Sequence, residues 1–120
     1  MPPSPRLANT ARGNAAEQQA LDYLLNQGLL FIEKNYRCQL GELDLIMRDG
    51  QTLVIVEVRF RQSNQFGGAA ASITTKKQAR IIAATEHYIM THPLDCPIRF
   101  DVVAITGDNA PDWIKNAFQT

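Results

Sequence analysis

The sequence predicts a single α/β domain whose elements follow the order αβββαβ. The chain has 120 residues, of which 45% are apolar, and this composition suits one core. Short runs rich in β-branched residues alternate with segments of helical spacing. One of these runs, residues 52–60, is apolar on both faces, which is typical of a central strand covered by helices on both sides.

The N-terminal half is predicted to contain one helix and three strands. The helix should begin at Asn14, a good N-cap with Glu17 three residues on, and end at Gly28. Residues 1–13 are expected to form a flexible tail before a domain over residues 14–120. The predicted strands cover residues 29–36, 42–48 and 52–60.

The C-terminal half is predicted to add a second helix and a fourth strand. The helix should begin near Thr74 or Thr75 and must end before Pro93, because the residue before a proline disfavours the helical region. Its apolar stripe consists of Ile81, Ile82, Thr85, Tyr88 and Ile89. A loop, a strand and a short amphipathic turn or helix that closes the core are expected at residues 61–73, 98–105 and 113–118.

The charge balance argues against a protein that is held to DNA by bulk positive charge. Lys and Arg number 12, as do Asp and Glu, so the formal net charge is zero. Residues 48–80 carry six basic and two acidic groups, whereas residues 81–120 carry two basic and five acidic groups. The middle third is therefore expected to face phosphates, with a chance fluctuation of charge as the alternative.

The two cysteines and the lack of apolar segments predict a cytoplasmic protein. Cys38 and Cys96 lie far apart in the sequence and are expected to be reduced thiols. A zinc site made by Cys96 with His87 and His92 is not favoured, because no fourth ligand is evident. No stretch approaches the ~20 apolar residues of a membrane helix, and the N-terminus lacks the apolar run of a signal peptide.

The hairpin between the second and third strands gathers charged side chains on one face. Asp49-Gly50 is a strong signal for a two-residue turn. In that register Glu42 lies opposite Glu57, and Asp44 is diagonal to Glu57. Because strand side chains alternate between faces, Arg59 joins the same face.

These carboxylates predict a divalent-cation site. Like charges that face each other across strands are destabilising, and an unpaired carboxylate in an apolar strand is costly. Arg59 supplies part of the compensation, and Mg²⁺ (or Mn²⁺) between Asp44 and Glu57 would supply the rest. Glu17 falls near the middle of the apolar arc of the first helix, so it is either a further site residue or a carboxylate that supports the N-cap.

Two sequence blocks carry a resemblance to a known family. They are Gly41-Glu42-Leu43-Asp44-Leu45-Ile46 and Val56-Glu57-Val58-Arg59-Phe60-Arg61, followed by Phe100-Asp101-Val102-Val103. The chain resembles the YraN family of small bacterial proteins over roughly residues 14–118. Through it, the chain is similar to PD-(D/E)XK nucleases and archaeal Holliday-junction resolvases.

The resemblance implies a restriction-endonuclease-like fold, a central mixed sheet flanked by helices. It also implies Mg²⁺-dependent hydrolysis of a phosphodiester bond in DNA, with branched or structured DNA as a candidate substrate. Asp44 and Glu57 match the metal-binding carboxylates, and Glu17 matches the helix carboxylate of resolvase-like members. Arg59 stands where the superfamily usually has lysine. A homodimer is expected by analogy, because resolvase-like relatives act on two strands.

Several roles remain alternatives at this point. The basic residues expected to hold flanking phosphates, or else to form a solvated face, are Arg61, Lys76, Lys77 and Arg80. Glu42 either orients a ligand or is an edge residue, and Asp101 is interpreted as structural. Since arginine stays charged and cannot act as a general base, the second hypothesis is a catalytically silent module that binds nucleic acid or a partner.

Overall fold

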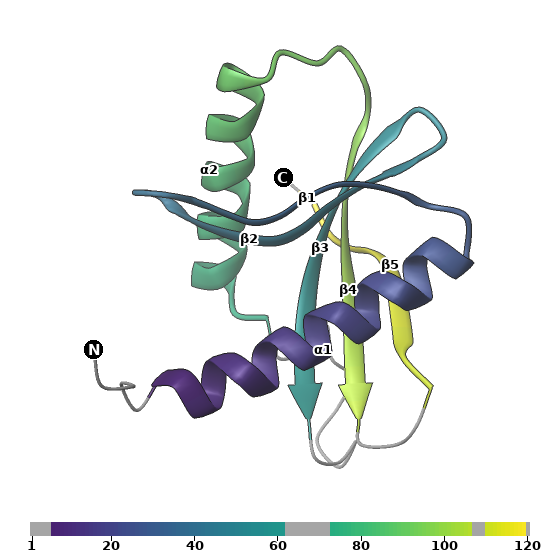
Figure 1. Cartoon of the computed structure of the whole chain (residues 1–120). Helices are drawn as coiled ribbons and strands as arrows, with labels where there is room; N and C mark the ends of the chain where they lie inside the picture. Colours follow the sequence, from purple (N-terminus) through teal and green to yellow (C-terminus); the bar gives the residue numbers. More distant parts are fainter. Residues whose placement is uncertain (1–5, 62–72, 107–109, 120) are drawn as a thin grey trace.

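The protein folds as a five-stranded sheet with one helix on each face (Figure 1). The computed structural model describes residues 6–61, 73–106 and 110–119, without the side chains of residues 6–14 and 61. The elements are α1 (Arg6–Asn26), β1 (Leu30–Cys38), β2 (Gly41–Asp49), β3 (Thr52–Arg61), α2 (Thr75–Thr91), β4 (Ile98–Thr106) and β5 (Asp112–Phe118). Most of the loop predicted at residues 61–73 lies outside the described residues.

The sheet is mixed and has the order β1-β2-β3-β4-β5. Among the described strands, only β3 and β4 pair in parallel, and α2 lies in the crossover that joins them. The other neighbouring strands pair antiparallel. This arrangement confirms the predicted α/β class with β3 at the centre, and it is consistent with a restriction-endonuclease-like core.

Each face of the sheet buries its own apolar cluster. The cluster under α1 includes Ala20, Leu24, Val54, Val56 and Val103. The cluster under α2 includes Ile55, Ile81, Ala84, Tyr88, Phe100 and Val102. Neighbouring β3 residues thus alternate between the two clusters, which is why the strand reads as apolar throughout.

The first helix ends as predicted but begins earlier. Gly28 has φ +97°, and its N–H donates to the carbonyl of Leu25 while Leu29 N–H donates to Leu24, both at 3.1 Å. These two bonds form a Schellman motif. The helix starts at Arg6 rather than Asn14, because residues 6–13 include good helix formers and one glycine costs only about 1 kcal/mol. The division into a tail and a domain stays a prediction.

The predicted hairpin turn was one residue out of place. Asp49 pairs with Thr52, so the two-residue loop is Gly50-Gln51. Gly50 has φ +62°, which suits the first central position of a type II′ turn. The register therefore slides by two residues along β3, and a slide of two keeps every side chain on its predicted face.

The closing segment is a strand rather than a turn or helix. In β5, Trp113 pairs with Val103 and Ile114 with Val102 of β4. Asn116 has φ +54° and lies where the register shifts, so the segment lacks the regular alternation that indicates a strand. No described helix is long and apolar enough to cross a membrane.

Candidate active site

The candidate site lies where β2 separates from β3 (Figure 1). Pairing between these strands runs from Asp49 and Thr52 to Leu45 and Val56. Beyond that point β2 stays paired with β1 alone, as far as Gly41. The Asp44 carboxylate lies at this fork, where its Oδ2 accepts a 2.9 Å hydrogen bond from Val58 N–H.

Asp44 and Glu57 form a hydrogen-bonded carboxyl pair at the fork. Glu57 is only 4% exposed, and Asp44 is partly buried. Burial, followed by the neighbouring Asp44 carboxyl, raises the pKa of Glu57 to about 8. Burial also raises the pKa of Asp44, although the bond from Val58 N–H opposes this shift. One proton is therefore shared between two carboxyl groups that cannot both ionise cheaply.

Two cations contact this pair through Glu57. Lys77 Nζ lies 3.5 Å from Glu57 Oε1, and an Arg59 guanidinium nitrogen lies 3.9 Å from the same oxygen. Lys77 was predicted among the phosphate-holding residues, but in this structure its ammonium group contacts a site carboxylate. Helical spacing could have indicated this contact, because Lys77 lies on the same face of α2 as the buried residues Ile81 and Tyr88.

Glu17 brings a third carboxyl group from α1 toward the fork. It is half-buried, and burial first, followed by Asp44 and Glu42, raises its pKa to about 7. With its amide nitrogen turned toward Glu17, Asn35 donates to both carboxyl oxygens at 2.8 and 3.1 Å. Asn35 has φ +56° in β1, a conformation that asparagine tolerates better than most residues. Sequence reasoning missed this partner.

The remaining predicted residues lie around the fork rather than in the pair. Glu42 is exposed and pairs with Arg37 of β1 at 3.4 Å, so its predicted position opposite Glu57 is wrong. The two-residue slide of the hairpin accounts for this difference. Lys76 and Arg80 are exposed on α2, and the side chain of Arg61 lies outside the described residues.

The Asp44–Glu57 pair suits Mg²⁺ by its donor chemistry. Mg²⁺ takes oxygen ligands and is commonly held by one or two carboxylates, with water and substrate phosphate completing its coordination. Burial raises the pKa of both groups, and a cation bound between them would oppose these shifts. Within the described ranges, no three His, Cys, Asp or Glu side chains form a metal-binding group.

Asp101 has a different environment and no part in this site. It is fully buried in β4. Its carboxylate accepts bonds from Arg99 Nε and a terminal guanidinium nitrogen, at 2.9 and 2.8 Å, and from Trp113 Nε1 and Asn116 N–H, both at 2.9 Å. Arg99 also binds Asp49 at 3.1 Å. These contacts agree with the structural interpretation of Asp101.

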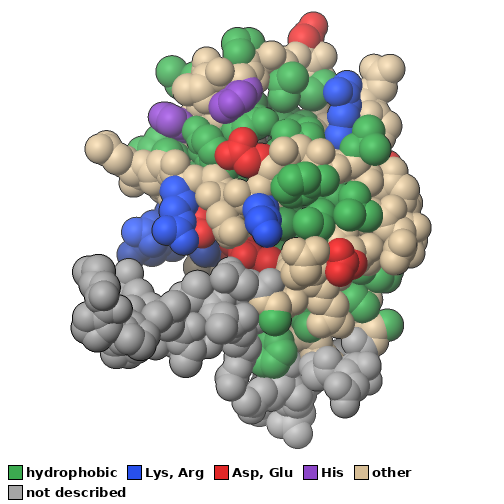
Figure 2. Space-filling model, viewed as in Figure 1, with side chains coloured by type: hydrophobic (Ala, Val, Ile, Leu, Met, Phe, Trp, Pro, Cys, Tyr) green, Lys and Arg blue, Asp and Glu red, His purple; other side chains and the backbone are tan. Residues whose placement is uncertain are grey.

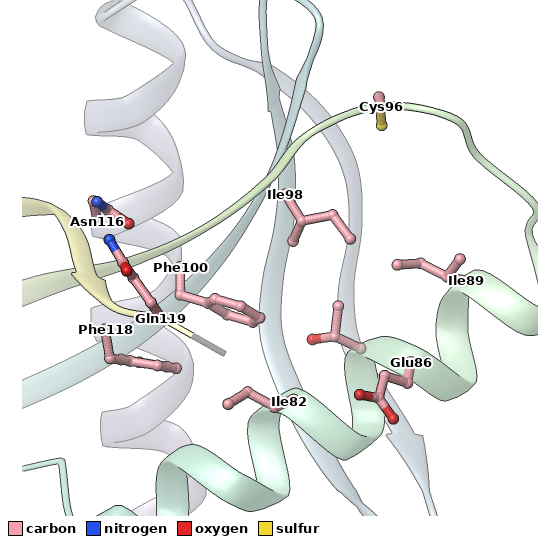
Figure 3. Close-up of a pocket in the computed structure, with 10 residues that line it drawn as sticks. Ile82, Glu86, Ile89, Cys96, Ile98, Phe100, Asn116, Phe118 and Gln119 are labelled. Carbon is pink, nitrogen blue, oxygen red and sulfur yellow. The ribbon is translucent and has the colours of Figure 1, made fainter.

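A second depression lies between α2 and the β4–β5 end of the sheet (Figure 3). It has a volume of about 460 Å³ and a mainly apolar lining that includes Ile82, Ile89 and Ile98. Phe100 and Phe118 stack at its base with ring centroids 5.0 Å apart. Glu86 is the one acidic side chain in its lining, so this depression lacks the paired carboxylates of the fork.

The sequence is closely similar to a family of bacterial proteins. Residues 16–105 match the family model of the uncharacterised protein family UPF0102. The chain belongs to UPF0102. This confirms the predicted resemblance to the YraN family.

UPF0102 relatives match almost the whole chain. A UPF0102 protein of Nitrosomonas europaea is 54% identical over 109 residues, which cover 89% of this chain and 92% of the relative. One from Legionella pneumophila strain Philadelphia 1 is 52% identical, covering 89% and 93%. One from Janthinobacterium sp. strain Marseille is 50% identical, covering 96% and 93%.

Proposed function

We propose that this UPF0102 protein is a metal-dependent endonuclease that hydrolyses a phosphodiester bond in DNA, with branched or structured DNA as the preferred substrate. The observation that carries the proposal is the buried Asp44–Glu57 pair at the sheet fork. Burying two carboxyl groups together costs stability. Strongly shifted pKa values with a named charge partner are also typical of functional sites.

The roles of the chain's own groups follow from their positions. Asp44 and Glu57 would hold Mg²⁺ or Mn²⁺, which when bound supplies an activated water and neutralises charge on the scissile phosphate. Lys77 and Arg59 provide fixed positive charge where negative charge develops on the phosphate. Arg59 cannot serve as a base, because it does not lose its proton.

Glu17 is the proposed proton acceptor. A general base works best when its pKa lies near the operating pH, and the pKa of Glu17 is about 7. Asn35 fixes the orientation of its carboxyl group by donating to both oxygens. The inward angle of Glu17 on the first helix made it a candidate site residue, and the raised pKa supports the role of proton acceptor.

The remaining parts of the proposal concern partners and location. Arg61, Lys76 and Arg80 are proposed to hold phosphates that flank the cleaved bond. Two copies of the chain are proposed to act together, because cleavage of both strands at a branch needs two sites; light scattering with and without DNA tests this. A cytoplasmic location agrees with the free thiols of Cys38 and Cys96.

The second candidate function is a catalytically silent module that binds nucleic acid or a partner. The contacts of Lys77 and Arg59 with one oxygen of Glu57 favour it, because two cations already offset that carboxylate without a metal. DNA binding that is lost in a Lys76→Ala, Lys77→Ala and Arg80→Ala triple variant, with no metal-dependent cleavage by the wild type, would support the silent module.

The deciding experiment compares cleavage by wild type, Asp44→Asn and Glu57→Gln on duplex, single-stranded, flapped and four-way DNA with Mg²⁺ or Mn²⁺. We expect each variant to lose at least ~10²-fold in rate, as when a preorganised charged group is removed from an active site. Glu86→Gln is the matched control, since Glu86 is an exposed α2 carboxylate away from the fork. Its rate should equal that of the wild type.

Two results would contradict the nuclease proposal. One is the absence of cleavage by the wild type with either metal on every substrate. The other is equal cleavage by wild type and both carboxylate variants. A calorimetric titration adds a separate readout, because Mg²⁺ binding that survives in Asp44→Ala would place the metal elsewhere.

A further inference from the structure

A cleft separates the tip of the β1–β2 hairpin from the first turns of α2. It has a volume of about 330 Å³ and is lined by residues 37–42 with Lys77, Arg80 and Ile81; we call it the hairpin cleft. The volume lies near the lower end of the range for small-ligand sites, about 300 Å³ and above. The hairpin reaches this position because β2 has already left β3 (Figure 1).

Gly41 keeps the wall of the hairpin cleft close to α2. A Cβ atom built on Gly41 would lie 2.8 Å from the backbone carbonyl oxygen of Arg80. That oxygen belongs to a helix backbone and cannot move aside easily, so only glycine allows this approach. The hairpin tip is therefore packed against α2 at a fixed distance.

The cleft has an excess of positive charge. Arg37, Lys77 and Arg80 line it, and Glu42 is the one acidic residue among its described lining residues. Glu42 pairs with Arg37 at 3.4 Å, whereas Arg80 has no ion-pair partner among the described residues. Figure 2 shows Lys and Arg side chains gathered on the side of the molecule where Figure 1 places the hairpin tip and α2. This charge favours a phosphate ligand.

Lys77 connects the hairpin cleft to the candidate active site. It lines the cleft, and its Nζ also lies 3.5 Å from Glu57 Oε1. A phosphate in the cleft would therefore neighbour the bond held at the fork. Under the proposed function, this adjacency suits the next nucleotide of the same strand.

The cleft also has an apolar part at its mouth. Leu40, at the tip of the hairpin, lines the cleft and is 53% exposed. An exposed leucine alone is unremarkable on a protein surface. Next to three cationic side chains, however, it offers a surface on which the face of a base can pack. A base inside a continuous duplex is stacked on both faces and cannot reach such a surface.

We propose that the hairpin cleft is a subsite for one unpaired nucleotide next to the cleaved bond, with Arg37, Lys77 and Arg80 on its phosphate and Leu40 against its base. The inference rests on the proposed function for its ligand class, and it deepens that function by selecting DNA with an unpaired nucleotide. It assigns roles to Arg37 and Leu40, which sequence analysis left without any.

The test measures binding of the full-length protein to fluorescent DNA by anisotropy, in EDTA so that no cleavage occurs. The probes are a duplex with one unpaired nucleotide and the same duplex fully paired. The variants are Arg37→Ala and Leu40→Ala. Their matched controls are Arg48→Ala and Leu30→Ala, exposed residues at the opposite ends of β2 and β1. Circular dichroism confirms that each variant is folded.

Arg37→Ala should weaken binding to the unpaired probe severalfold and lower the slope of log affinity against log salt by about one. Leu40→Ala should reduce the preference for the unpaired probe over the paired probe severalfold. Arg48→Ala and Leu30→Ala should match the wild type.

The subsite is overturned if Arg37→Ala behaves as Arg48→Ala, if Leu40→Ala behaves as Leu30→Ala, or if the wild type binds both probes equally or not at all. Its failure can be told apart from failure of the nuclease proposal. Cleavage that depends on Asp44 with unchanged binding by Arg37→Ala refutes the subsite alone. Binding that depends on Arg37 and Leu40 without any cleavage refutes the nuclease alone.

Discussion

Asp101 and the Asp44–Glu57 pair are both buried carboxyl sites on the same sheet, but their surroundings differ in kind. Asp101 accepts four hydrogen bonds, two of them from the Arg99 guanidinium. Among the described residues, Val58 N–H donates to Asp44, and Lys77 and Arg59 place cations 3.5 and 3.9 Å from Glu57 Oε1. We call Asp101 the saturated site, because four donors of the fold hold its carboxylate, whereas under the proposed function the pair takes a further cation.

This difference shows that the hydrogen-bond partners of a buried carboxyl group indicate whether its role is structural or functional. A buried carboxylate whose hydrogen bonds come from its own fold holds together the elements that donate to it. Burial raises the pKa of both carboxyl groups of the pair, and under the proposed function a metal ion would replace the proton that they share. The predictions below test this contrast through protein stability.

The largest effect is expected at the saturated site. Asp101→Ala leaves Arg99, Trp113 Nε1 and the N–H of Asn116 without their acceptor inside the fold. Removing one partner of a buried ion pair typically costs about 3–5 kcal/mol. Urea denaturation of Asp101→Ala should show a loss of this size. A loss similar to that of an exposed control such as Asp112→Ala would break the contrast.

An opposite effect is expected at the pair. The pKa of Glu57 is about 8 in the folded protein against 4.5 for the unfolded reference, so the folded state binds more protons between these values. The free energy of unfolding should therefore fall as pH rises from about 4.5 to 8, and stay level above. Glu57→Gln removes this loss, and we expect it to be more stable than the wild type at pH 8.5 by on the order of 2 kcal/mol.

The effect is smaller than the full pKa shift of Glu57 would give, because Asp44 keeps its own raised pKa in the variant. Denaturation of wild type and Glu57→Gln at pH 5 and pH 8.5 provides the measurement. Mg²⁺ should stabilise the wild type at pH 8.5 and leave Glu57→Gln nearly unchanged. A wild type whose stability rises between these pH values would contradict the proposed state of the pair.

The smallest effect is expected from a single donor of the saturated site. Trp113→Phe removes one of the four bonds to Asp101 and keeps an aromatic ring near Tyr23. Because three donors remain, the cost should be about 1 kcal/mol. A double-mutant cycle with Asp101→Asn, followed by urea denaturation, measures the coupling. A coupling energy near zero would show that the Trp113 bond does not contribute.

The fold could be predicted where the local signal was regular. The helix α2 begins at Thr75, within the predicted range, after a cap in which Thr74 accepts a 3.1 Å bond from Lys77 N–H, and β3 is the central strand as predicted. The strand β5 was missed because Asn116 interrupts its alternation. Its position depends on the bond from Asn116 N–H to Asp101, a long-range contact that no local pattern contains.

The candidate site could be predicted in part, because a shift of two residues in the β2–β3 register leaves each side chain on the same face of the sheet. Asp44 and Glu57 share a face under either register, so their meeting did not require the turn to be placed correctly. The partners that come from other elements could not be found this way. Lys77 reaches Glu57 from α2 and Asn35 reaches Glu17 from β1, and both contacts depend on how helices pack on the sheet.

The hydrogen bond from Val58 N–H to Asp44 helps to set the point at which pairing between β2 and β3 ends. The backbone group that could extend the β2–β3 ladder is occupied by a side chain, so the carboxylate acts as a terminator of strand pairing. Alanine at this position would free the donor and favour further pairing, which would close the gap that exposes the site. Asparagine at position 44 keeps an acceptor oxygen for Val58 N–H. The Asp44→Asn variant therefore tests the loss of the negative charge without the loss of this hydrogen bond.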